Sequence, residues 1–230
     1  MADRDEARQS EPDTLRVERA LEPTPDAAST PPREGIAAVV LMDVSGSMDE
    51  EIRGSEEPKI AVARRAAVDL VSQFDAYADA HPDEPVLVGL FEFSGRAGAS
   101  TREVIPLSRP DPEAAQRAVG KMYADGGTPI GDAMIVGKQA LDRSGLSRRH
   151  LLVVTDGENT DGFAPSDVMN ALSSRPEIER PSVYFVAFNI SANRFDRVRS
   201  AGALVLEAAN AQELNQTLDS LLSGKILVEQ

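Results

Sequence analysis

The fold of this 230-residue chain is decided by the stretch AAVVLMDVSGSM, at residues 37–48. Its first half, residues 37–42, is a continuous apolar run of strand length, which is typical of a strand that is covered on both faces. Its second half places an aspartate and two serines at alternate positions just after this strand. A second buried strand is predicted at residues 151–154, and it leads into the stretch TDGE at residues 155–158. We therefore expect two buried strands that each end in an aspartate.

Strands and helices alternate around these two runs. Further strands are predicted at residues 86–93, 101–107, 183–188 and 204–206, and helices at residues 58–74, 112–122, 130–141, 165–172 and 192–201. A last helix is expected to start at Asn210 and to end at Gly224. This alternation indicates crossover units, and hence a mostly parallel sheet with helices on both faces. The short link at residues 94–100 favours an antiparallel hairpin at one edge.

The first 34 residues differ from the rest of the chain. They are charged and interrupted by proline, so they bury too little apolar surface to offset the entropy of ordering, and we expect a flexible arm. Residues 15–21 carry three apolar side chains and would form either an additional edge strand or part of a solvated tail. Residues 35–230 are expected to form one folded domain.

The composition excludes several classes of function. The formal net charge is −14, from 24 Lys and Arg against 38 Asp and Glu, and such a surface repels nucleic acids and anionic membranes. The chain has no Cys, which excludes disulfides, zinc–thiolate sites, iron–sulfur clusters and thiol catalysis. No apolar stretch approaches the ~18 residues of a membrane span, and Met1 opens on a polar run rather than on a signal peptide. We therefore expect a cytoplasmic protein.

Four oxygen-bearing side chains are candidate ligands of a metal ion, Asp43, Ser45, Ser47 and Asp156, and the loop DGGTPIG at residues 125–131 lies between them in the sequence. Taken singly, each of their loops is better explained by a turn followed by a helix cap. Taken together they favour a site, because ligands of an open α/β sheet bind beyond the carboxyl ends of its strands. Two converging carboxylates require a cation or a proton between them. Hard oxygen ligands suit Mg2+, Mn2+ or Ca2+ rather than zinc.

The order and spacing of these four residues, together with Thr128 in the stretch GGTP between them, resemble the metal-ion-dependent adhesion site of von Willebrand factor type A domains. All five positions of the motif match, and the resemblance covers about residues 35–228. The stretches GGTP, IGDA and TDGEN are similar to those of prokaryotic members of the family. The resemblance implies a doubly wound, Rossmann-like sheet of about six strands, the third of them short and antiparallel.

The resemblance also implies a role for each residue. The hydroxyls of Ser45, Ser47 and Thr128 would touch the metal, and Asp43 and Asp156 would approach it directly or through water. The under-neutralised ion would then take an Asp or Glu side chain from a protein partner. Some relatives act beside AAA+ ATPases of the MoxR kind or in stress-resistance operons, so an ATPase or a stress-response complex is an expected partner.

Catalysis has weaker support in the sequence. There is no Gly-x-Ser-x-Gly element and no P-loop, and only His81 and His150 could serve as a base. We therefore expect a binding module rather than an enzyme. Two alternatives stay open at this point. One is a Mg2+-dependent phosphoester hydrolase that uses Asp43 or Asp156, and the other is a structural domain whose site stays empty.

Overall fold

The computed structural model describes residues 13–22, 31–52, 54–96 and 98–228. Six strands form one sheet in the order β3-β2-β1-β4-β5-β6. Their bounds are β1 (Arg33–Asp43), β2 (Val86–Phe93), β3 (Thr101–Ser108), β4 (Leu146–Thr155), β5 (Ser182–Phe188) and β6 (Leu204–Ala208). β3 runs antiparallel to β2, whereas β1–β2, β1–β4, β4–β5 and β5–β6 pair in parallel. The predicted fold class, a mostly parallel six-stranded sheet with one antiparallel edge strand, is confirmed.

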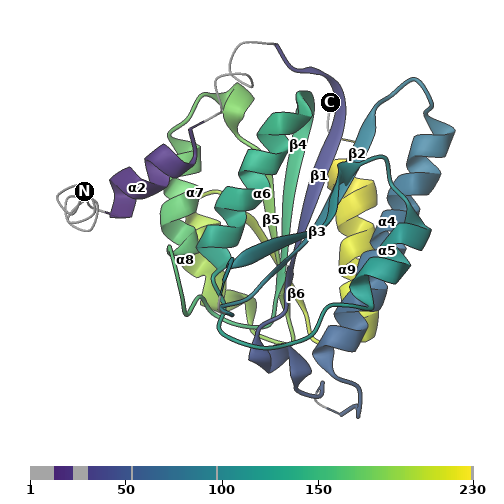
Figure 1. Cartoon of the computed structure of the whole chain (residues 1–230), viewed down its shortest axis with the longest axis vertical. Helices are drawn as coiled ribbons and strands as arrows, with labels where there is room; N and C mark the ends of the chain where they lie inside the picture. Colours follow the sequence, from purple (N-terminus) through teal and green to yellow (C-terminus); the bar gives the residue numbers. More distant parts are fainter. Residues whose placement is uncertain (1–12, 23–30, 53, 97, 229–230) are drawn as a thin grey trace.

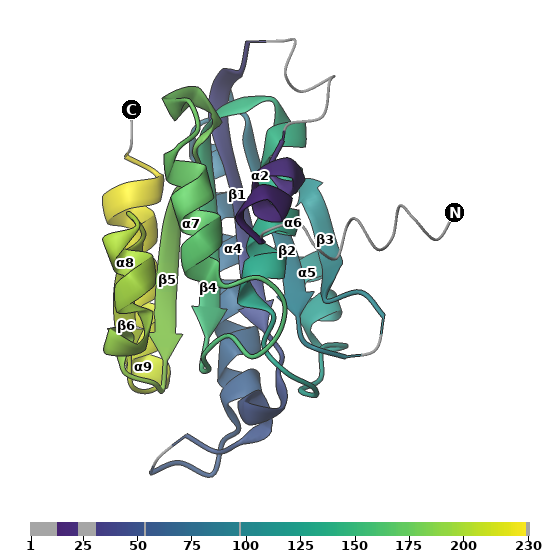
Figure 2. The ribbon, with the colours of Figure 1, turned by 90° about the vertical axis from the view of Figure 1, so that its left-hand side faces the viewer.

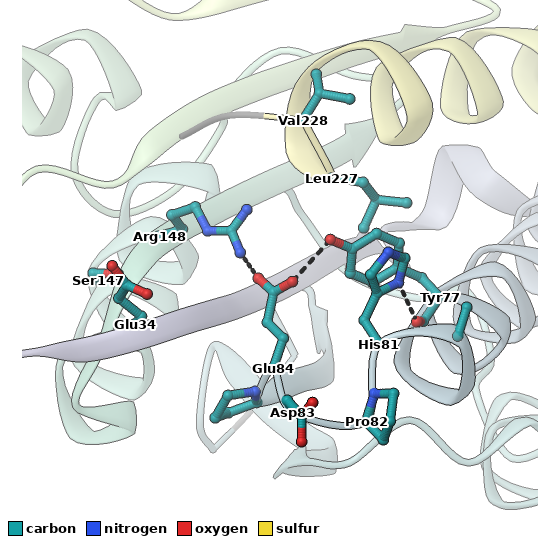
Figure 3. Close-up of a pocket in the computed structure, with 12 residues that line it drawn as sticks. Glu34, Tyr77, His81, Pro82, Asp83, Glu84, Ser147, Arg148, Leu227 and Val228 are labelled. Carbon is teal, nitrogen blue, oxygen red and sulfur yellow. Dashed lines mark hydrogen bonds and ion pairs between the residues drawn. The ribbon is translucent and has the colours of Figure 1, made fainter.

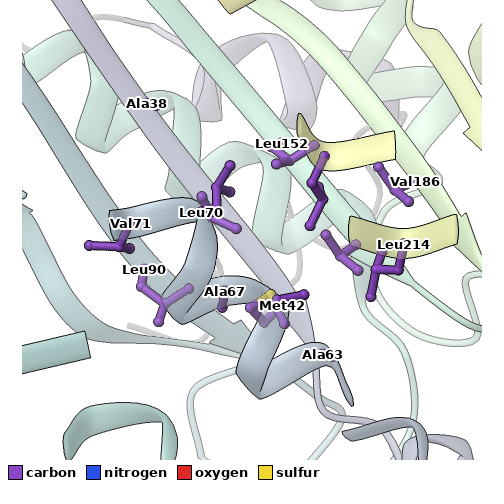
Figure 4. Close-up of a cluster of buried hydrophobic side chains, with 14 of the residues drawn as sticks. Ala38, Met42, Ala63, Ala67, Leu70, Val71, Leu90, Leu152, Val186 and Leu214 are labelled. Carbon is purple, nitrogen blue, oxygen red and sulfur yellow. The ribbon is translucent and has the colours of Figure 1, made fainter. Parts of the chain in front are cut away.

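Helices cover both faces of the sheet (Figure 1). One face carries α4 (Lys59–Ala80), α5 (Pro112–Val119) and α9 (Ala211–Leu221), and the other carries α6 (Ile130–Ser144), α7 (Pro165–Ser173) and α8 (Asp196–Ser200). β1 contributes side chains to the hydrophobic core on both faces of the sheet, because successive side chains of a strand point in opposite directions. Ala38 and Met42 pack with α4 and α9 (Figure 4), while Val39 and Leu41 pack with α6. This explains the unbroken apolar run of the sequence.

The centre of the sheet provides the place for a site. β1 lies between β2 and β4, and the chain continues from β1 into α4 on one face, whereas α6 precedes β4 on the other face. A sheet wound in both directions from its middle opens a crevice at the carboxyl ends of those strands. Asp43 is the last residue of β1, and Asp156 directly follows the last residue of β4.

Part of the expected flexible arm is a docked helix instead. Helix α2 (Asp13–Ala20) packs beside α6 and α7 (Figure 2), and Val17 and Leu21 are fully buried there. Residues four apart share one helix face, so Val17 and Leu21 lie together on the docked side, whereas Leu15, the third apolar residue of this stretch, is 48% exposed. Lys138 and Gln139 of α6 donate to the backbone oxygens of Leu21 and Ala20, at 2.8 and 2.9 Å. Residues 1–12 and 23–30 of the arm lie outside the described residues, and β1 begins at Arg33, within the range expected for the arm.

The helix at the carboxyl end does not stop at Gly224 as expected. A π-helical turn, η4 (Leu222–Ile226), follows α9 directly and carries the chain past the glycine. Leu222 and Ile226 are buried in the core beneath α4 and α9. The burial of these two side chains favours continuation of the helical path over a glycine stop. Among the described residues, no helix combines the length and the apolar character that a membrane crossing requires.

Candidate metal centre

Asp43 is the innermost acid of the candidate site and is fully buried. Its Oδ1 accepts a hydrogen bond from the backbone N–H of Ser45 at 2.7 Å, and its Oδ2 accepts one from the Thr155 hydroxyl at 2.5 Å. Burial raises the pKa of Asp43 from 3.8 to about 6, against the lowering effect of these hydrogen bonds, and the charge of Asp156 adds to the rise. A nearby cation would stabilise the charged form of such a buried carboxylate.

Ser45, Ser47 and Asp156 form a short chain of oxygen atoms. The two serine Oγ atoms lie 3.2 Å apart, and Ser47 donates to Asp156 Oδ1 at 2.7 Å. The alternation of the stretch after β1 brings the two hydroxyls to one side, and Asp156 arrives from the neighbouring strand, 109 residues later than Ser47. Three oxygens that were separate predictions from the sequence therefore lie side by side.

These oxygens suit a magnesium ion. Mg2+ is held at about 2.0–2.1 Å in an octahedron, so its adjacent ligands lie about 2.9 Å apart. The hydrogen-bonded separations of 3.2 and 2.7 Å place these oxygens close enough to share one ion, and the ligand atoms are hydroxyl and carboxylate oxygens without sulfur or nitrogen. The described residues contain no group of three or more His, Cys, Asp or Glu side chains that could hold a metal. A metal here would therefore depend on the hydroxyls.

Thr128 reaches the site from the loop before α6. Gly126, with φ of +79°, accepts a hydrogen bond from the N–H of Gly46 at 2.9 Å, which ties this loop to the serine-bearing loop. A Cβ atom placed on Gly157 would lie 3.5 Å from Thr128 Oγ1 and 3.8 Å from Ser47 Oγ. Both hydroxyls thus border the same small space beside Gly157. All five predicted residues lie at one edge of the sheet.

Lys59 belongs to this site, although the sequence analysis did not single it out. Lys59 is 6% exposed. Its Nζ donates to Asp156 Oδ2 at 2.8 Å and to Glu50 Oε2 at 2.9 Å. Burial lowers the pKa of Lys59, but the hydrogen bonds and charges of Asp156 and Glu50 outweigh it, so the net shift is upward. One signal was visible in the sequence. A lysine in the first turn of a helix opposes the helix dipole, and such a position calls for an acidic partner.

The two histidines lie away from this edge. His150 is buried inside β4, which begins five residues earlier than predicted, and burial lowers the pKa of His150 to about 4, with a smaller effect of the Arg148 charge. His81 follows the end of α4 and stacks on Tyr77. Neither imidazole borders the oxygen atoms of the candidate site.

A hollow lined by described residues lies at the opposite, amino-terminal edge of the sheet, and Figure 3 shows the side chains that line it. It has a volume of about 960 Å³ and is lined by Glu34, Tyr77, His81, Glu84 and Arg148, among others. Its polar groups bind one another: Tyr77 donates to Glu84 at 2.9 Å, Arg148 pairs with Glu84, and His81 Nδ1 lies 2.9 Å from the backbone oxygen of Tyr77. This cavity contains none of the five predicted residues.

Comparison with known proteins places the fold among known relatives. Residues 38–218 match the family model described as von Willebrand factor type A domain. A solved structure described as von Willebrand factor type A from Catenulispora acidiphila is similar at 19% identity and a TM-score of 0.64, over 82% of this chain and 42% of that one. The PilB minor pilin from Streptococcus sanguinis is similar at 14% identity and a TM-score of 0.64, over 86% of this chain and 63% of the pilin.

A third similar structure is an aerotolerance-related membrane protein from Bacteroides fragilis NCTC 9343 with multiple mutations to serines. It is 16% identical with a TM-score of 0.61, over 85% of this chain and all of that one. No curated protein was found to match the chain. The first two structures are longer than the matched region, so the chain spans less than two thirds of each. At these identities the likeness concerns the fold.

Proposed function

This chain belongs to the von Willebrand factor type A family, a family of protein-interaction modules, and from that premise we propose that it binds a partner protein through a divalent cation. The proposed ligands are Ser45, Ser47 and Thr128 through their hydroxyls, with Asp43 and Asp156 as the acids of the site. Mg2+ is the proposed ion, and Mn2+ and Ca2+ are the alternatives. The observation that carries the proposal is the oxygen chain Ser45–Ser47–Asp156, with its separations of 3.2 and 2.7 Å.

The residues of this chain prepare the site by orienting its oxygens. Thr155 and the Ser45 N–H hold both oxygens of Asp43, so that this carboxylate keeps a fixed position behind the hydroxyls. Ser47 and Lys59 hold the two oxygens of Asp156. When bound, the cation would supply a positive centre that can attract an external carboxylate. An Asp or Glu side chain of a partner protein fits that requirement, because carboxylate oxygens are preferred ligands of Mg2+.

We propose that the module binds without catalysing a reaction. A nucleophilic serine needs a base within hydrogen-bond reach, and His150 lies within β4 while His81 lies at the opposite edge of the sheet. An AAA+ ATPase of the MoxR kind is the narrower partner that the resemblance of the sequence suggests. Turnover of a phosphoester such as p-nitrophenyl phosphate that requires Mg2+ and is lost in Asp43→Asn would contradict this part of the proposal.

The test compares metal binding in three proteins. Titration calorimetry with MgCl2 should show binding to the unchanged chain and a loss of at least tenfold in affinity in Ser47→Ala. Ser72→Ala is the matched control, because its hydroxyl binds the backbone oxygen of Val68 in α4, outside the site. Capture of a partner from the native cell should then require Mg2+ and disappear with EDTA. Equal metal affinity in all three proteins, or no binding at millimolar Mg2+, would refute the proposal.

A further inference from the structure

A buried ammonium lies among the proposed metal ligands. Lys59 Nζ is 2.8 Å from Asp156 Oδ2 and 3.3 Å from the backbone oxygen of Ser47, and the Lys59 side chain is 7% exposed while that of Asp156 is fully covered. Asp156 Oδ1 is the atom that Ser47 contacts. The two oxygens of one carboxylate are thus divided between the hydroxyl cluster and a tethered cation. Buried charges persist in proteins when they are paired in this way.

The charges of this cluster can be counted. Asp43 and Asp156 contribute two negative charges and Lys59 one positive charge, so the cluster without metal has one negative charge in excess. A divalent cation changes this to one positive charge in excess. Without Lys59, two carboxylates and one divalent cation would already be neutral. The lysine therefore creates the requirement for one further anion.

We propose that Lys59 is the resident cation of this site: it keeps metal binding weak and makes the loaded site take one carboxylate from outside. The proposal rests on the proposed metal-dependent function and explains why a partner acid would be held. Glu50 also contacts Lys59, at 2.9 Å, but its side chain is 68% exposed, and water screens an exposed charge. Glu50 therefore compensates only part of the excess positive charge of the metal-loaded cluster.

A merely structural role for Lys59 predicts the opposite result for metal affinity. If the lysine only held Asp156 in place, its removal would disorder a ligand and weaken Mg2+ binding. If it acts as a resident charge, its removal leaves two uncompensated carboxylates and strengthens Mg2+ binding. The sign of the change in affinity separates the two roles.

The experiment uses the 230-residue chain and Lys59→Met, which keeps an unbranched apolar stem and removes the charge. Titration calorimetry with MgCl2 should give at least about tenfold tighter binding in the variant, because a buried charge this close is poorly screened. The rise of the melting temperature on adding Mg2+ should also be larger in the variant. Arg65→Met is the control, since it removes one positive charge from the same helix, where Arg65 pairs with Glu57 on the surface, and its affinity should stay within about twofold.

A second variant keeps the test valid if Lys59→Met does not fold. Glu50→Gln removes the exposed carboxylate that partly offsets Lys59, so its Mg2+ affinity should fall by about two- to threefold, as expected for an exposed charge. Affinity that is unchanged or lower in Lys59→Met, or higher in Glu50→Gln, overturns the inference. Binding by Lys59→Met but not by the unchanged chain supports the inference and refutes the proposed function. Binding by neither protein overturns both.

Discussion

Replacement of Asp43 by Asn should stabilise the metal-free protein at neutral pH. Burial raises the pKa of Asp43 from 3.8 to about 6, so the folded protein binds this proton more tightly than the unfolded chain does. The folded state is therefore favoured below pH 4, and this advantage is lost as the pH rises to about 6. At pH 7 the folded protein must keep a charged carboxylate in a buried position.

The size of the effect follows from the same shift. A difference between 3.8 and about 6, at about 1.4 kcal/mol for each pH unit, corresponds to about 3 kcal/mol. Asn can keep the local hydrogen bonds. Its Oδ1 can accept from the Ser45 N–H, and its Nδ2 can donate to the Thr155 hydroxyl, which also lies 3.1 Å from the backbone oxygen of Gly157 as an alternative acceptor. The substitution should therefore cost little hydrogen-bonding free energy while it removes the buried charge.

The assay is urea unfolding of both proteins in EDTA, at pH 4 and at pH 7. Asp43→Asn should have nearly the stability of the unchanged chain at pH 4 and up to about 3 kcal/mol more at pH 7. Addition of Mg2+ at pH 7 should stabilise the unchanged chain and not the variant. Asp83→Asn, an exposed acid near the opposite edge of the sheet, is the control. A stability difference that does not change with pH, or a less stable variant at pH 7, would refute this account of Asp43.

Three further changes test the fold around the site. Burial lowers the pKa of His150 from 6.5 to about 4, so as the pH falls the imidazole is protonated in the unfolded chain before it is protonated in the folded one. Between pH 6.5 and about pH 4 the unchanged chain should therefore lose up to about 3 kcal/mol of unfolding free energy relative to His150→Phe, as measured by urea unfolding. Leu21→Ala should cost about 2–4 kcal/mol of unfolding free energy, because Leu21 is fully buried. Leu15→Ala is the control and should cost less than about 0.5 kcal/mol, because Leu15 is 48% exposed. Equal costs would mean that α2 is not docked in solution. Gly131→Ala should lower stability by about 1–3 kcal/mol and weaken Mg2+ binding, since its Cβ would lie 2.0 Å from the backbone oxygen of Phe163, in the loop that follows Asp156. Gly224→Ala, which meets nothing within 4 Å, is its control, and equal melting temperatures of the two variants would contradict this packing.

The mostly parallel sheet and its antiparallel edge could be predicted from local patterns. Apolar runs such as residues 37–42 and the short link at residues 94–100 depend on nearest neighbours along the chain, and they indicated the sheet and its antiparallel edge. The proximity of Asp43 and Asp156 followed from one general property, since the carboxyl ends of parallel strands meet at the same edge. The predicted fold class is confirmed, and the metal itself stays a prediction.

Other features depend on partners far away in the chain. Lys59 reaches Asp156 across 97 positions, and Lys138 reaches Leu21 across 117. Residues 15–21 were interpreted as an edge strand or a solvated tail, whereas the structure has a helix there whose Val17 and the following Leu21 are buried against α6 and α7. The periods of strands and helices are local, so the residue pattern was enough to specify the α/β fold and the edge of the sheet where the acids gather. The pairing of Lys59 with those acids and the docking of the first helix are visible only in the folded chain, because burial and charge pairing act between residues that are distant in the sequence.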